Sequence, residues 1–267
     1  MSLIQEQFFD IGANLTHKSF KSDIDKVIID SIENGVRRMS VTGSCLADSI
    51  IAAEIAEEYS ETCVSTAGIH PHNAKEYSLE LFSEIKDLLN KDSVKCIGET
   101  GLDFNRNFSS PEQQIKSFEA HLELSIEKDL PLFLHERDAH EKFVEITSTC
   151  INDLPKSVVH CFTGEKDSLI KYLDMGFYIG ITGWLCDERR GSHLKELIPL
   201  IPLEKLMIET DSPYLIPRDM GLDNSTRNEP KYLPHIAKRI SEIRQESEEL
   251  VFSSIYMNSL DFFDISI

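Results

Sequence analysis

Eight short apolar runs alternate with helical patterns along this chain, and that alternation most constrains how it can fold. The runs cover residues 8–11, 37–42, 63–69, 94–98, 132–134, 158–159, 177–181 and 206–208. Helix-like stretches such as 47–59 and 111–128 separate them. Strands that alternate with helices are typical of parallel βαβ units. Eight such units in 267 residues favour an α/β fold of the (β/α)8 TIM barrel type over an open sheet, because this barrel takes about 250 residues.

Composition narrows the class of protein. No Ser-, Gly- or Pro-rich linker divides the sequence, so we expect a single domain over residues 1–267. The 27 Lys and Arg residues against 46 Asp and Glu residues give a net charge of −19. This charge excludes a protein that holds duplex nucleic acid through an overall positive field. The longest charge-free apolar stretch, 175–186, is shorter than the ~18–20 residues of a membrane span, so we expect no membrane partner.

The N-terminal residues and the cysteines indicate a compartment. The first ten residues lack the basic and apolar regions of a secretory signal. The six cysteines form no C-x-x-C pair, and those at 63, 96 and 161 lie in apolar, strand-like runs, where we expect them to be buried. Buried, reduced thiols are typical of cytoplasmic proteins. We therefore expect a cytoplasmic protein, and nothing in the sequence indicates an obligate protein partner.

Titratable side chains stand in or at the ends of six of the apolar runs. They are Asp10, His70, Glu99, His135, His160, and the pair Glu209 and Asp211. In a (β/α)8 barrel the C-terminal ends of all strands open onto one face, which carries the active site. Any one of these residues alone fits a hydrogen-bonded structural role. Together they predict a shared site.

The side chains gathered in this way suit a divalent metal ion. Two imidazoles with carboxylates make a mixed nitrogen and oxygen ligand set, which fits Mg²⁺, Mn²⁺ or Zn²⁺. A bound ion inverts the local potential, so an acidic chain can still attract a phosphate. Such an ion polarises a phosphoryl oxygen and lowers the pKa of a bound water.

Six motifs in order carry a family resemblance. They are DIGANL at 10–15, AGIHPH at 67–72, IGETGLD at 97–103, HCFTG at 160–164, ETDSPYL at 209–215 and RNEP at 227–230. Together they resemble the TatD family of metal-dependent deoxyribonucleases over nearly the whole chain. The resemblance implies a TIM-barrel hydrolase that cuts DNA phosphodiesters as a 3′–5′ exonuclease on single strands. It favours Mg²⁺, allows RNA as a further substrate, and raises a role in DNA repair.

The resemblance also implies roles for particular residues. The family's metal ligands fall on Glu99, His135, His160 and Asp211, and His70 would lie near the scissile phosphate. Asp211 would also accept the proton of the attacking water. Glu209 shares the strand face of Asp211 and would orient a ligand or assist proton transfer, unless it is a buried supporting carboxylate.

One position departs from the family pattern. Many members begin with D-x-H-x-H, whose histidines hold one metal of a pair, whereas this chain has Gly12 and Asn14 at those places. Gly12 offers no ligand and Asn14 only a neutral oxygen. We therefore expect one firmly held ion, with any second ion entering together with the substrate.

Three arginines are candidate phosphate ligands, and two other functions stay open. Arg106, Arg137 and Arg227 follow expected strand ends, where each could bind phosphate or pair with an acidic side chain. The alternative enzyme is a metal-dependent amidohydrolase acting on a C–N or lactone bond, which shares the barrel and the metal. A non-enzymatic binding protein is the second alternative, but it has no need of four ligands on four strands.

Overall fold

The computed structural model describes residues 6–223 and 225–266. Eight parallel strands follow one another in a single sheet whose order is β1 to β8. The strands are β1 Phe8–Ala13, β2 Val36–Val41, β3 Cys63–Ala67, β4 Val94–Asp103, β5 Leu132–Arg137, β6 Ser157–Val159, β7 Tyr178–Ile181 and β8 Leu206–Ile208. All eight apolar runs are thus strands, and the strand order with alternating helices confirms the predicted (β/α)8 topology.

Helices connect the strands. The α-helices are α1 Ile24–Glu33, α2 Leu46–Glu58, α3 Leu79–Leu88, α4 Pro111–Lys128, α5 His140–Ser148, α6 Lys166–Asp174, α7 Leu194–Leu197, α8 Leu233–Ile243 and α9 Glu248–Phe262. The 3-10 helices are η1 Pro71–Glu76, η2 Gly183–Cys186, η3 Ile198–Leu200, η4 Leu203–Lys205, η5 Arg218–Met220 and η6 Pro230–Tyr232. Within the described part of the chain, no helix is both long and apolar enough to cross a membrane.

The chain divides into two compact units. The first unit comprises residues 1–40 and 179–267, and the second comprises residues 41–178. The boundaries run through β2 and β7, so each unit contains neighbouring strands of the sheet. The single domain expected over residues 1–267 stays a prediction.

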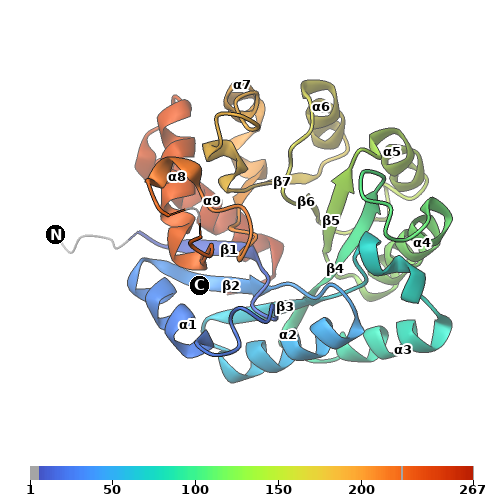
Figure 1. The fold of residues 1–267 in the computed structure, drawn as a ribbon. Coiled ribbons are helices and arrows are strands. Elements are labelled where there is room, and N and C mark those ends of the chain that lie inside the picture. The colour runs from blue at the N-terminus through green and yellow to red at the C-terminus, as the bar shows by residue number, and fades with distance from the viewer. Residues whose placement is uncertain (1–5, 224, 267) are drawn as a thin grey trace. The chain divides into compact units, whose positions relative to one another are not determined.

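The second unit contains β3 to β6 with α2 to α6 packed outside them (Figure 1). The helix α4 shows how the sequence sets an element's ends. Ser110 caps its first turn by accepting a hydrogen bond from the Gln113 amide at 3.4 Å, and the Gln113 side chain accepts one from the Ser110 amide at 2.9 Å. Pro111 stands at the first helical position, and Asp129 ends the helix in the left-handed conformation with φ 52°. Phe118 of this helix stacks on Phe143 with ring centroids 5.2 Å apart.

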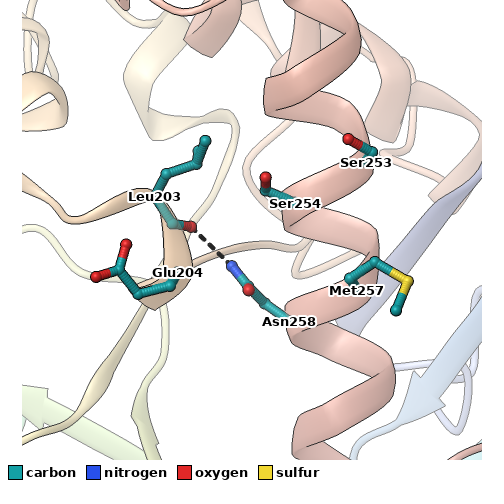
Figure 2. A pocket seen from close by; sticks show the side chains of 6 residues that line it. All are labelled: Leu203, Glu204, Ser253, Ser254, Met257 and Asn258. Atoms are coloured by element: carbon teal, nitrogen blue, oxygen red, sulfur yellow. Dashed lines mark hydrogen bonds between the residues drawn. The ribbon is translucent and has the colours of Figure 1, made fainter.

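In the first unit, aromatic residues pack between β1 and the C-terminal helix. Phe9 stacks on Phe263 with ring centroids 5.0 Å apart, and Phe8 packs edge-on against Phe252 at 5.1 Å. The helix α9 is also tied to the start of β8 through Asn258, whose Nδ2 donates to the carbonyl oxygens of Leu203 and Leu206, each at 2.8 Å. Figure 2 shows the contact to Leu203 beside a surface cavity of about 350 Å³.

Candidate metal centre

Strand β4 carries Glu99 inside the strand rather than at its end, where the sequence placed it. Glycines flank the carboxylate-bearing segment on both sides, and both have positive φ, 138° at Gly98 and 139° at Gly101. A Cβ atom would come within 2.4 Å of the Phe133 carbonyl oxygen at Gly98 and within 2.0 Å of the His135 carbonyl oxygen at Gly101. These positions therefore require glycine. The pairing register between β4 and β5 also shifts between Ile97 and Thr100, which sets the Glu99 segment apart from the regular ladder.

Three imidazoles surround one oxygen of this carboxylate. Glu99 Oε1 lies 3.1 Å from His70 Nε2, 2.9 Å from His135 Nδ1 and 2.7 Å from His160 Nε2. His70 follows β3, His135 lies in β5 and His160 follows β6, so neighbouring strands of the second unit supply all four residues. We call these four residues the histidine group. The side chains of Glu99 and His160 are buried, and those of His70 and His135 are largely so.

Hydrogen bonding fixes the protonation of His70. Its Nδ1 accepts a hydrogen bond from the His72 amide at 3.0 Å, so the ring proton sits on Nε2 and faces Glu99. Burial lowers the pKa of His70 to about 4, which makes this imidazole neutral at pH 7. Burial opposes ionisation of Glu99, but the surrounding imidazoles hold its pKa well below the usual range. Glu99 is therefore an ionised carboxylate, the state that a metal ligand needs, whereas the protonated Nε2 of His70 is a hydrogen-bond donor.

A second carboxylate, Asp103, borders the histidine group and was not among the predicted site residues. Its Oδ2 lies 2.8 Å from His72 Nε2 and 3.5 Å from His135 Nε2. Its Oδ1 accepts hydrogen bonds from the Asn105 and Arg106 amides at 3.0 and 2.8 Å. Although burial acts against ionisation, these contacts keep the pKa of Asp103 far below normal. The HPH and ETGLD motifs contain both His72 and Asp103, so the sequence held a signal for this pair.

The donor atoms of the histidine group fit a divalent cation. One ligand atom each from His70, Glu99 and His135 lies within 4.8 Å of the others. His135 Nε2 is buried and makes no short hydrogen bond among the described residues, its contact with Asp103 Oδ2 being 3.5 Å long, and such atoms are rare in folded proteins. Three nitrogens also point at one carboxylate oxygen, more than its two lone pairs accommodate. A cation among these atoms would resolve both features.

The first unit holds Asp211 at the end of β8 by a separate set of contacts. Asn14 Nδ2 donates to Asp211 Oδ1 at 2.8 Å, and the Asp211 amide donates to the Gly12 carbonyl oxygen at 2.9 Å. Asp211 has a left-handed backbone with φ 50°. The two positions that lack the family's histidines therefore orient Asp211, one through its side chain and the other through its backbone. No local sequence pattern indicated this role.

Asp10 supports the same segment from within β1. Its carboxyl accepts hydrogen bonds from the Thr210 amide at 2.9 Å and from the Thr210 hydroxyl at 2.5 Å. Burial, opposed by these hydrogen bonds, raises the pKa of Asp10 to about 8. We call Asp10, Asn14, Thr210 and Asp211 the aspartate group. The neighbouring Glu209 is fully buried.

Asn228, from the RNEP motif, braces the segment that follows β8. Its Nδ2 donates to the carbonyl oxygens of Thr210 and Tyr214, at 2.8 and 2.5 Å. The motif thus contributes a buried amide that fixes the backbone on either side of Asp211.

Comparison with known proteins identifies the family. The family model for TatD related DNase matches residues 9–264. The chain belongs to the TatD related DNase family. It is 46% identical over 258 residues to the 3'-5' ssDNA/RNA exonuclease TatD of Pantoea ananatis. That alignment covers 96% of this chain and 99% of the Pantoea protein. It is 45% identical over 259 residues to the protein of the same name from Escherichia coli K12, with 97% and 99% covered.

Solved structures of TatD proteins share the fold. A TatD homologue from Escherichia coli K12 superimposes with a TM-score of 0.90 at 23% identity, covering 98% of this chain and 100% of that one. A TatD family hydrolase from Entamoeba histolytica superimposes with a TM-score of 0.84 at 28% identity, covering 96% of this chain and 98% of that one. The predicted TatD family and (β/α)8 fold are confirmed. Membership in this family favours a nuclease over the amidohydrolase alternative.

The three arginines expected to bind substrate differ in their surroundings. Arg106 lies in the turn after β4 with an exposed side chain, and Arg137 is the last residue of β5. The Arg227 guanidinium uses all five of its donors, toward Asp23, Glu229 and the Ser19 carbonyl oxygen. It also lies 4.3 Å from the ring centre of Phe20. Phosphate binding by these three arginines stays a prediction. Arg227 would first have to break its ion pairs with Asp23 and Glu229.

A further cluster of metal-type side chains lies in the first unit. It consists of Cys186, Asp219 and His235, which the sequence did not bring together. His235 Nε2 and Arg239 Nε donate to the two oxygens of Asp219 at 2.7 and 2.6 Å. The guanidinium neutralises the carboxylate, and burial raises the pKa of the Cys186 thiol to about 12. Hydrogen bonding therefore accounts for this cluster.

The six cysteines are free thiols, as expected. Cys63 and Cys96 are buried, whereas Cys161 is only partly so, because it follows His160 in a left-handed conformation with φ 45° just outside β6. The expectation that Cys161 is a buried strand residue was therefore wrong.

Proposed function

We propose that this protein is a metal-dependent 3′–5′ exonuclease that hydrolyses the phosphodiester bonds of single-stranded DNA and of RNA. The observation that carries the proposal is the buried, ionised Glu99 with three imidazole nitrogens within 3.1 Å of one oxygen, in a chain of the TatD related DNase family. The relatives of similar length named above as exonucleases support the substrate class.

We assign the metal ligands to Glu99, His135, His160 and Asp211. Mg²⁺ is the ion that we propose, with Mn²⁺ and Zn²⁺ as alternatives that the same donors accept. When bound, the ion supplies positive charge that polarises the phosphate and lowers the pKa of a water molecule. One ligand set of this kind supports one firmly held ion.

Other residues of the chain supply positioning and proton transfer. His70 carries its proton on Nε2, so we propose that it donates a hydrogen bond to a phosphate oxygen at the cleavage site. Asn14 orients Asp211 through a hydrogen bond to one carboxylate oxygen, and we propose that Asp211 accepts a proton from the attacking water. Glu209 is buried beside this segment, where we propose that it orients the ligands rather than contacting substrate.

A digestion experiment tests the proposal. Single-stranded DNA and RNA oligonucleotides, labelled at the 5′ or the 3′ end, are incubated with the protein and Mg²⁺, Mn²⁺ or EDTA. We expect a 5′-labelled strand to shorten stepwise and a 3′ label to be released first as a mononucleotide, with no reaction in EDTA. Cleavage in EDTA, or release of the 5′ nucleotide first, would contradict the proposal.

A further inference from the structure

A cavity of about 220 Å³ lies in the first unit, where the segments that follow β7 and β8 meet. Its lining includes Trp184 and Arg190 from the first segment, and Pro213, Leu215, Ile216 and Arg218 from the second. The walls therefore combine apolar surface with two arginines and one carboxylate, Asp187, which pairs with Arg190. Pro213 follows Asp211 by two residues, so the cavity begins beside the end of the strand that supplies Asp211.

Trp184 and Arg190 form a stacked pair at the rim of this cavity. The Arg190 guanidinium carbon lies 4.5 Å from the Trp184 ring centre, a cation–π contact. The indole Nε1 donates to the Arg190 carbonyl oxygen at 3.1 Å, which fixes the ring. Gly191 permits this turn, because a Cβ there would come within 2.0 Å of the Trp184 carbonyl oxygen. We call this pair the Trp184–Arg190 platform.

Asp187 fixes the orientation of the Arg190 guanidinium. This buried carboxylate accepts a hydrogen bond from Arg190 Nε at 3.2 Å and also pairs with Arg189 at 3.0 Å. The Arg190 side chain is nevertheless 50% exposed. A planar cation that is held on one side and open on the other loses little conformational entropy when an aromatic ring stacks on it.

We infer that this cavity is a nucleobase subsite, in which one base of a single strand stacks on the Trp184–Arg190 platform. The inference rests on the proposed function, because it places a base of the same nucleic acid that is to be cut. Arg190 and Arg218 add positive charge for the adjoining phosphates, which the net charge of −19 otherwise repels. Every base has a π face, so this subsite accepts any sequence and does not separate DNA from RNA.

The first test compares kinetics on a normal DNA oligonucleotide, an RNA of the same length, and an abasic strand with the same sugar-phosphate backbone. For Arg190→Ala we expect KM on both normal strands to rise about 5- to 150-fold, the range of one lost stacking contact. Its KM on the abasic strand should stay at the wild-type value. Arg190→Lys keeps the charge but not the plane, so it should behave like the alanine variant.

Arg189→Ala is the matched control. Arg189 shares Asp187 with Arg190, yet it is 71% exposed and is not part of the cavity lining. We expect its KM on all three strands to match the wild type, with thermal denaturation confirming that each variant is folded. Equal effects of the Arg189 and Arg190 variants, or full rescue by Arg190→Lys, would overturn the subsite. A wild-type protein that cuts no strand at all would instead overturn the proposed exonuclease.

The second test uses intrinsic fluorescence, because Trp184 is the single tryptophan of the chain. A hydrolysis-resistant phosphorothioate oligonucleotide is titrated in Mg²⁺ while the anisotropy of its own label reports binding. We expect Trp184 emission to be quenched in step with binding, and an abasic strand to bind without quenching. Saturated binding of the normal strand with unchanged emission would refute stacking at this site.

Discussion

The histidine group and the aspartate group are held in place by different means. In the histidine group, three imidazoles converge on one carboxylate oxygen, and one buried nitrogen of His135 makes no short hydrogen bond among the residues described. In the aspartate group, both oxygens of Asp10 are satisfied, and an amide of Asn14 holds Asp211. The first arrangement is typical of a metal-binding cluster. The second is typical of a positioned acceptor.

The largest expected effect comes from breaking the histidine group. His135→Ala removes a proposed ligand and should lower kcat/KM by more than about 10³-fold, since a catalytic metal contributes several kcal/mol. Metal analysis after dialysis should show a matching loss of bound Mn²⁺. His140→Ala is the control, because His140 bonds Tyr172 outside this group. Undiminished turnover of the His135 variant would refute its role.

A smaller effect is expected from loosening the aspartate group. Asn14→Ala leaves Asp211 without its amide donor, and loss of a contact that orients a ligand typically costs about 10- to 100-fold in activity or metal affinity. Asn14→Asp places a second carboxylate beside Asp211, so the pKa of this pair should rise. The acidic limb of its pH–rate profile should then move to higher pH. A variant with wild-type activity and an unmoved profile would show that Asn14 does not position Asp211.

Variants of Arg227 and Arg106 distinguish an arginine that stabilises the fold from one that binds substrate. Arg227→Ala removes a half-buried ion pair and should lower the free energy of unfolding by about 1–2 kcal/mol, with KM nearly unchanged. Arg106→Ala should leave stability unchanged and raise KM a few-fold, because its exposed side chain is free of such a network in the contacts described. Urea unfolding and steady-state kinetics on both variants check this pair. The opposite pattern would make Arg227 the phosphate ligand.

The aspartate group also predicts a dependence of stability on pH. The pKa of Asp10 rises from 3.8 to about 8 on folding, so between these values the folded state holds a proton that the unfolded state has lost. The contribution of Asp10 to the free energy of unfolding is therefore complete below pH 3.8. It falls by up to about 1.4 kcal/mol per pH unit as the pH rises from there to about 8. Asp10→Asn should flatten this slope in urea unfolding. Asp30→Asn is the control, because a hydrogen bond from Lys26 lowers the pKa of that partly exposed carboxyl instead.

The fold could be predicted from the sequence because strand periodicity and helix signals are local. The eight apolar runs and the helix at 111–128 needed no knowledge of distant contacts. Sequence reasoning singled out Glu99, His135 and His160, which lie together in the structure, because their residue types suggested a metal, and their binding of an ion stays a prediction. It placed Glu99 at a strand end, since the shift in register between β4 and β5 depends on pairing that a single sequence does not show.

The supporting residues were harder to predict. Asn14 lies 197 positions from Asp211, and its type suggests no function without that contact. Arg227 has the residue type and position of a phosphate ligand, yet Asp23 and Glu229 already engage it. Such roles depend on which partner a side chain finds, which local sequence patterns do not specify.

The central claim is that the histidine group binds the catalytic metal ion, and anomalous diffraction from a crystal soaked in Mn²⁺ tests it most directly. We predict a strong manganese peak bonded to Glu99 and His135, lost in the His135→Ala variant. A soaked crystal with no peak beside Glu99, or with its manganese only at Cys186, Asp219 and His235, would contradict this account.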